Sequence, residues 1–126
     1  MEKPAMTAPR AIHFADPLPA PTLDQPAPER CIGTPPRRTT WELYEQQGIS
    51  MGVWACEPGA WKIAFHAHRH EFFQVLEGRL QLIADSGEVR EYGPGDAAII
   101  PAGFSGVFKV IEAVKKRYVM VDQPAG

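Results

Sequence analysis

Turn signals at short, regular spacing constrain this chain more than any other feature of its sequence. Glycine and proline interrupt regular structure, and here they fall between short apolar segments. Segments of this length leave room for β-strands but not for ordinary helices, so the pattern predicts an all-β sandwich or barrel. The turn motifs are Glu57-Pro58-Gly59, Glu77-Gly78, Asp85-Ser86-Gly87, Gly93-Pro94-Gly95-Asp96 and Pro101-Ala102-Gly103.

The segments between these turns predict the strands. They are rich in branched and aromatic residues, and several alternate between apolar and polar positions. Residues 41–46 alone allow a short helical turn. The expected strands cover residues 49–56, 61–65, 71–76, 79–83, 88–92, 97–100, 107–111 and 114–121.

Prolines divide the chain, because nine of the 13 lie before Arg37. Proline lacks an amide donor, so this region can enter neither a helix interior nor a central strand. We therefore predict an extended arm over residues 1–36 and a barrel domain over residues 37–122. The arm is either a solvated tail or a segment that packs on a neighbouring subunit of a homodimer and covers an open sheet edge. Its apolar anchors for such packing are Ile12, Phe14, Leu18 and Leu23.

Charge and composition argue against several classes of function. The net charge of −2 gives no electrostatic footprint for nucleic acid or for an anionic membrane. No apolar run approaches the roughly 18 residues of a spanning helix, and residues 1–16 lack the apolar core of a signal peptide. Cys31 and Cys56 form neither a disulfide framework nor a C-x-x-C motif. The expected location is a reducing cytoplasm.

Two glycine-bounded segments resemble the signature motifs of the cupin superfamily. The first motif runs Gly, five residues, His-x-His, three or four residues, Glu, six residues, Gly, and Gly59 to Gly78 keeps that spacing. The second runs Gly, five residues, Pro-x-Gly, two residues, His, three residues, Asn, and it begins here at Gly95. The resemblance covers about residues 39–121. It implies a jelly-roll barrel, also described as an RmlC-like double-stranded β-helix.

Between Glu71 and Tyr118 the chain is similar to a small cupin subgroup that includes ureidoglycine aminohydrolase-like domains. The residues that carry that similarity are Gly78, Gly95-Asp96, Pro101-x-Gly103, residues 109–112 and residues 116–118. The subgroup implies a divalent metal ion (Mn, Fe, Ni or Zn) that polarises a small nitrogen-rich substrate.

The expected metal-ligand positions depart from the cupin pattern. Phe65 and Ala67 stand where the first motif has its two histidines. Gly106 and Val110 stand at the histidine and asparagine of the second motif. Of the four ligand positions, only the one occupied by Glu71 has a side chain that can bind a metal.

A histidine cluster offers a second route to a metal. His66, His68 and His70 lie directly before Glu71, and His66, His68 and Glu71 together would form a ligand set that divalent metals accept. Because side chains alternate along a strand, this set needs a bulge, or a turn at Arg69-His70, to face one site. The alternatives are a solvated or interfacial histidine face, including a pH-sensitive contact. Glu71 could equally form an ion pair with the basic residues Lys62, Arg69 or Arg79.

The same alternation selects the residues that line the interior. If Glu71 points inward, alternation places Phe73 and Val75 on the same inner face. The positions of the second motif likewise place Gly106, Phe108 and Val110 on the inner face. We expect a small-molecule pocket lined by Phe65, Phe73 and Phe108. Glu71 is the first catalytic candidate. Tyr118, on a strand of alternating character, is the second because it can present its hydroxyl to the pocket.

Three functions remain open at this level. The first is a metal-dependent enzyme of the ureidoglycine aminohydrolase type. The second is a metal-free small-molecule-binding or sensor cupin that uses Glu71 and Tyr118 to orient its ligand. The third is a structural dimer whose barrel is filled by its phenylalanines.

Overall fold

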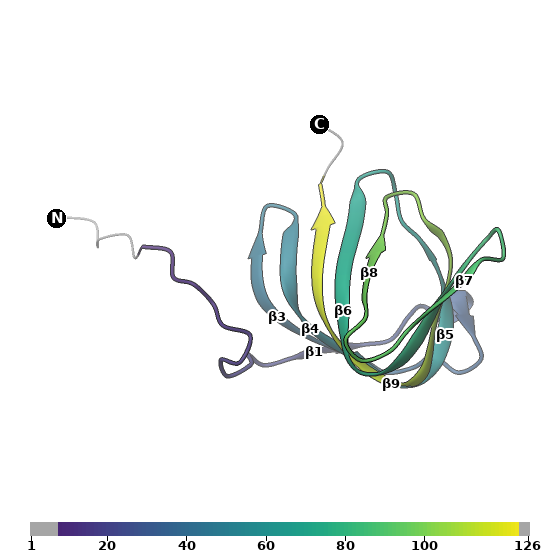
Figure 1. The fold of residues 1–126 in the computed structure, drawn as a ribbon, viewed down its shortest axis with the longest axis horizontal. Coiled ribbons are helices and arrows are strands. Elements are labelled where there is room, and N and C mark those ends of the chain that lie inside the picture. The colour runs from purple at the N-terminus through teal and green to yellow at the C-terminus, as the bar shows by residue number, and fades with distance from the viewer. Residues whose placement is uncertain (1–7, 124–126) are drawn as a thin grey trace.

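A computed structural model describes residues 8–123, which form an antiparallel sheet that curls into a jelly-roll barrel (Figure 1). One 3-10 turn, η1 (Pro28–Arg30), is the only helical element of the described chain. The all-β prediction is confirmed. The strands are β1 (Thr22–Asp24), β2 (Cys31–Ile32), β3 (Arg38–Gln46), β4 (Ile49–Cys56), β5 (Gly59–Ala64), β6 (Arg69–Ala84), β7 (Val89–Tyr92), β8 (Ala97–Ile100) and β9 (Ser105–Asp122).

The long strand β9 organises the sheet. Its first half pairs with β5 and its second half with β4, while β6 pairs along most of its other edge. The opposite edge of β6 pairs with β8 and then with β7. Residues near both ends of β9 are thereby held on the wall of one barrel.

The core follows the alternation of β6 and β9. Phe73 and Val75 on β6 are buried, as are Gly106, Phe108 and Val110 on β9. All five were expected to point inward. The neighbouring side chains of Phe72 and Ile111 are exposed. One face of each strand therefore builds the interior.

A bulge at Gly78 corrects the predicted strand pattern. The sequence predicted a turn at Glu77-Gly78, but β6 continues through it as one strand with register shifts between Val75 and Leu80. Gly78 has φ +82°, and a Cβ there would lie 2.1 Å from the carbonyl oxygen of Ala113. The bulge reverses the side-chain parity, so that Leu80, rather than an odd-numbered residue, is buried beyond it. The two segments predicted at 107–111 and 114–121 likewise join into β9.

Residues 41–46 are extended in β3, so the prediction of a possible short helical turn there is wrong. A two-residue hairpin connects β3 to β4, with Gln47 and Gly48 both at positive φ. This backbone matches the twist of paired strands. Tertiary pairing thus overrides the weak local preference.

The proline-rich region divides into two parts. Residues 8–21 lead away from the barrel (Figure 1), and the side chains of Ile12 and Leu18 are exposed. Among the predicted anchors in this segment, Phe14 is partly buried and its ring lies 5.7 Å from the Arg117 guanidinium of β9. The following segment joins the sheet, because β1 pairs with β3 and β2 pairs with β5. Both cysteines are free. No helix within residues 8–123 is long and apolar enough to cross a membrane.

Candidate functional site: a barrel pocket with a buried ion pair

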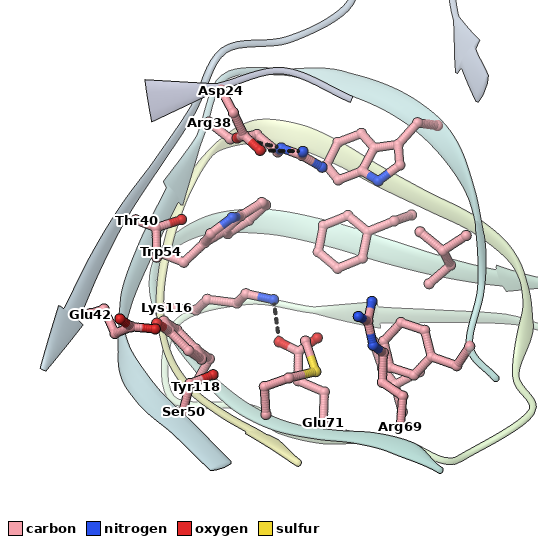
Figure 2. A pocket seen from close by; sticks show the side chains of 16 residues that line it. Asp24, Arg38, Thr40, Glu42, Ser50, Trp54, Arg69, Glu71, Lys116 and Tyr118 are labelled. Carbon is pink, nitrogen blue, oxygen red and sulfur yellow. Dashed lines mark hydrogen bonds and ion pairs between the residues drawn. The ribbon is translucent and has the colours of Figure 1, made fainter. Parts of the chain in front are cut away.

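The barrel interior contains a pocket of about 370 Å³. Its wall combines an apolar side with six charged side chains, which is the composition of a site for a small polar molecule. Figure 2 shows these side chains around the cavity. The lining residues are Asp24, Arg38, Thr40, Glu42, Ser50, Trp54, Trp61, Ile63, Phe65, Arg69, Glu71, Ile100, Phe108, Lys116, Tyr118 and Met120.

An ion pair between Lys116 and Glu71 lies on this wall. Lys116 Nζ donates a hydrogen bond of 2.7 Å to Glu71 Oε2 (Figure 2), and the two side chains are only 4% and 7% exposed. Glu71 comes from β6 and Lys116 from the middle of β9, where it pairs with Trp54 and Val75. This bond uses one of three N–H donors and one of two carboxylate oxygens. The pair therefore keeps polar atoms for a ligand.

Three aromatic rings surround the Lys116 ammonium group. Nζ lies 4.3 Å from the ring centroid of Phe73, 4.5 Å from that of Trp54 and 4.9 Å from that of Phe108. Trp54 and Phe108 meet edge to face, and Phe108 stacks on Trp61 at 5.0 Å. The faces of aromatic rings attract cations, most strongly where water is excluded. The rings and Glu71 together stabilise the buried positive charge.

A second cation, Arg69, lies at the start of β6 and also lines the pocket (Figure 2). Its Nε and Nη2 donate to Asp122 Oδ2, and its guanidinium lies 5.7 Å from the Phe65 ring centroid. The hydrogen bond from Arg69, assisted by one from His66, lowers the pKa of Asp122 below its usual value. Asp122 therefore stays ionised and fixes the position of Arg69 at the pocket wall.

A third cation comes from the N-terminal part of the barrel. Arg38 on β3 donates two hydrogen bonds, of 2.9 and 2.6 Å, to the carboxylate of Asp24 on β1. The Arg38 guanidinium also lies 5.5 Å from the Trp61 ring centroid. The short pairing of β1 with β3 thus brings a carboxylate from the region predicted as an arm to the pocket.

Tyr118 lines the pocket as expected, on the same face of β9 as Lys116. Burial, together with the nearby carboxylates of Glu42 and Glu71, raises the pKa of Tyr118 to about 12. Its hydroxyl therefore remains protonated at neutral pH and is available as a hydrogen-bond donor.

The structure does not bring the predicted ligands His66, His68 and Glu71 together. β6 begins only at Arg69, so His66 and His68 lie on the preceding loop, with exposed side chains. His66 Nε2 contacts Asp122 Oδ1 at 2.7 Å, and its Nδ1 accepts the backbone N–H of His68. The turn falls at Ala67-His68, two residues before the turn at Arg69-His70 that would bring the histidines and Glu71 to one site. The parity of β6 consequently turns Arg69, not a histidine, inward beside Glu71.

The residues present at the pocket do not fit a divalent metal ion. Of the positions at which the cupin motifs place ligands, only Glu71 has a side chain that can bind a metal, and a lysine ammonium is hydrogen-bonded to it. Within residues 8–123 no three histidine, cysteine or acidic side chains gather into a metal-binding group. Lysine in this charged form repels a metal and offers it no lone pair.

The expected aromatic lining divides in the structure. Phe65 and Phe108 line the pocket, while Phe73 is fully buried in the core behind Lys116. Asp24, Arg38 and Lys116 were not among the sequence candidates. Arg69 was considered only as an ion-pair partner of Glu71, a role that Lys116 takes in the structure. A signal existed for Lys116, because it shares the inward parity of Tyr118 on a strand of alternating character.

Comparisons with known proteins support the fold assignment. A profile of the EutQ-like cupin domain family matches residues 43–118, which is more than half of the chain. A solved structure from Pseudomonas syringae pv. tomato, of a DUF861-family protein of unknown function, superposes with a TM-score of 0.74 at 23% identity. That alignment covers 87% of this chain but 46% of the other, so the chain spans less than half of that protein.

Two further structures have the same fold. The EutQ protein of Clostridium difficile has a TM-score of 0.62 at 19% identity, with 71% of each chain covered. Ectoine synthase from P. lautus has a TM-score of 0.60 at 13% identity, with 70% of this chain and 66% of that chain covered. At these identities the likeness concerns the fold alone. No protein of curated function matches this sequence.

Proposed function

The chain belongs to the EutQ-like cupin domain family, and we propose that its barrel binds a small metabolite at the Lys116–Glu71 ion pair. The burial of this pair in a pocket wall is the observation that carries the proposal. Removing two charges from water costs several kcal/mol per ion, and apolar side chains of similar size are often as stable or more stable. Fold stability is therefore a weak reason for these two residues, and a ligand is a stronger one.

The charges around the pocket suggest the class of ligand. Lys116 and Arg69 offer N–H donors to an anionic group, and Tyr118 adds a neutral donor. Glu71 offers an acceptor to an N–H group, and Trp61 with Phe108 provides an apolar wall. A small carboxylate that also carries amine, amide or ureido nitrogen uses each of these features. The volume of about 370 Å³ lies at the small end of ligand pockets.

A ureidoglycine-like metabolite belongs to this ligand class, so the substrate suggested by the sequence resemblance remains part of the proposal. The divalent metal of that resemblance does not, because the pocket residues do not fit one. We assign Glu71 and Tyr118 to ligand orientation, with Glu71 accepting and Tyr118 donating a hydrogen bond. If either residue is catalytic, it would act through the same group, the carboxylate of Glu71 or the hydroxyl of Tyr118.

Thermal unfolding in the presence of stable probes tests this proposal. N-carbamoylglycine supplies a carboxylate and a ureido group, glycine a carboxylate and an amine, and acetate a carboxylate alone. A ligand that binds only the folded protein at about a hundred times its Kd stabilises it by about 2.7 kcal/mol, which raises the Tm by several degrees. We expect N-carbamoylglycine to give the largest rise.

Two variants make the test specific to the pocket. Glu71→Gln should abolish the rise, because the charged acceptor is lost. Glu91→Gln is the matched control, since Glu91 is an exposed carboxylate that binds Arg79 and Gln81 on the outside of the barrel. The proposal is wrong if the rise is unchanged in Glu71→Gln, or if none of the three probes stabilises the native protein.

A further inference from the structure

The environment of Lys116 has the composition of a receptor for an ammonium ion. Trp54, Phe73 and Phe108 present their rings to Nζ, all within 4.9 Å, and Glu71 supplies the counter-charge at 2.7 Å. Quaternary and primary ammonium groups are recognised by this combination of aromatic faces and a carboxylate. In this barrel the ammonium ion is the end of a side chain of β9, that of Lys116.

The position of this ion within the fold is also informative. At the positions where the cupin motifs place metal ligands, Glu71 is the one residue whose side chain can bind a metal. Its carboxylate accepts the hydrogen bond from Lys116. The other positions are Phe65, Ala67 and Gly106, none of which can bind a metal. The positive charge that a cupin motif places beside its glutamate is thus present here, but it belongs to a side chain.

Packing alone gives no reason for a lysine at this position. A methionine side chain would fill a similar volume to that of Lys116, without the cost of burying a charge. Neighbouring inward positions on β9 are apolar, as at Val114, or carry an uncharged hydroxyl, as at Tyr118. The feature peculiar to Lys116 is its charge.

We propose that the Lys116 ammonium is the resident cation of this barrel and takes the place of a divalent metal ion. It is held by Glu71 and the cage of Trp54, Phe73 and Phe108. A charge supplied in this way is part of the chain and does not depend on metal supply. It presents N–H donors, rather than an open coordination position, to whatever enters the pocket.

Chemical complementation tests this inference. Lys116→Ala removes three methylene groups and the ammonium, which together correspond to n-propylammonium. We expect the variant to unfold at a lower temperature than the native protein. At about 20 mM n-propylammonium its Tm should rise by at least about 2 °C. The uncharged analogue 1-propanol should not raise it, and neither compound should stabilise Lys109→Ala, whose lysine is on the outer face of β9.

The double variant Glu71→Gln/Lys116→Ala should lose the response, because the cage then lacks its counter-charge. An unchanged Tm of Lys116→Ala with n-propylammonium, or an equal response to 1-propanol, would overturn the inference.

A measurement on the native protein keeps the inference testable if Lys116→Ala does not fold. Untagged protein should show no stabilisation by Mn²⁺, Fe²⁺, Ni²⁺ or Zn²⁺ that Glu71→Gln removes. Any stabilisation that comes from the exposed histidines should instead be lost in the triple variant His66→Ala/His68→Ala/His70→Ala. Metal stabilisation that depends on Glu71 contradicts the inference. Neither experiment involves N-carbamoylglycine, so this inference and the proposed ligand function can fail separately.

Discussion

At the scale of single residues, the chemistry of the pocket depends on Glu71 and Lys116. Each residue alone would be a buried charge in an aromatic environment, which is costly. Together they form a hydrogen-bonded pair that the surrounding rings accept. The two positions are therefore strongly coupled, and substitutions at them should not be additive.

A double-mutant cycle measures this coupling. Glu71→Met and Lys116→Met should each destabilise the protein by about 3–5 kcal/mol, because each leaves one uncompensated buried charge. The double variant should be more stable than either single variant while failing to bind N-carbamoylglycine. The exposed pair Arg79–Glu91 is the control, and its single methionine variants should cost no more than about 1 kcal/mol. Denaturant unfolding provides all the values, and additive losses at Glu71 and Lys116 would contradict the coupling.

Alternation predicted part of this site from the sequence. It placed Glu71, Phe108 and Tyr118 on the inner face, and the structure has all three in the pocket wall. It could not place His66 and His68, because they precede the first residue of β6 and a strand parity does not extend into a loop. Lys116 was missed because a lysine on a strand is usually solvated. Only the Glu71 carboxylate, on the neighbouring strand β6, offsets the cost of burying this charge.

At the scale of elements, the bulge of β6 determines which side chains face the pocket. Before Gly78 the odd-numbered residues Phe73 and Val75 point inward, and after it Leu80 does. A straight strand would turn one of these sets toward solvent. The sequence located the glycine but not its role, because Glu-Gly is equally compatible with a turn and with a bulge.

Substitution of this glycine should therefore be severe. Gly78→Ala places a Cβ 2.1 Å from the Ala113 carbonyl oxygen in addition to the cost of φ +82°. Gly87→Ala is the matched control, because Gly87 has φ +97° but no atom within 4 Å of the added Cβ. We expect the control to lose about 1 kcal/mol of unfolding free energy and Gly78→Ala to lose at least about 2 kcal/mol more. Equal losses in denaturant unfolding would show that the close approach at Ala113 is not needed.

At the scale of the whole molecule, segments far apart in the sequence build one pocket. Asp24 comes from β1, Arg38 from β3, Glu71 from β6 and Lys116 from β9. We expected the barrel to begin after residue 36, so the contribution of Asp24 to the pocket was not predicted. Proline content indicates where a strand is disfavoured, but it does not indicate that the short segment β1 pairs with β3. Residues 8–21 lead away from the barrel with Ile12 and Leu18 exposed (Figure 1). Packing of this arm on a second copy, in the expected homodimer, stays a prediction.

In this cupin barrel we propose that a lysine side chain, rather than a metal ion, supplies the cation beside the motif glutamate. Crystals of the untagged protein grown with an excess of Mn²⁺ or Zn²⁺, and measured at the absorption edge of each metal, test it most directly. We predict no anomalous peak at bonding distance, about 2.0–2.2 Å, from the Glu71 carboxylate, with Lys116 Nζ still hydrogen-bonded to it. A metal peak on Glu71, with the lysine displaced from the aromatic cage, would contradict the account.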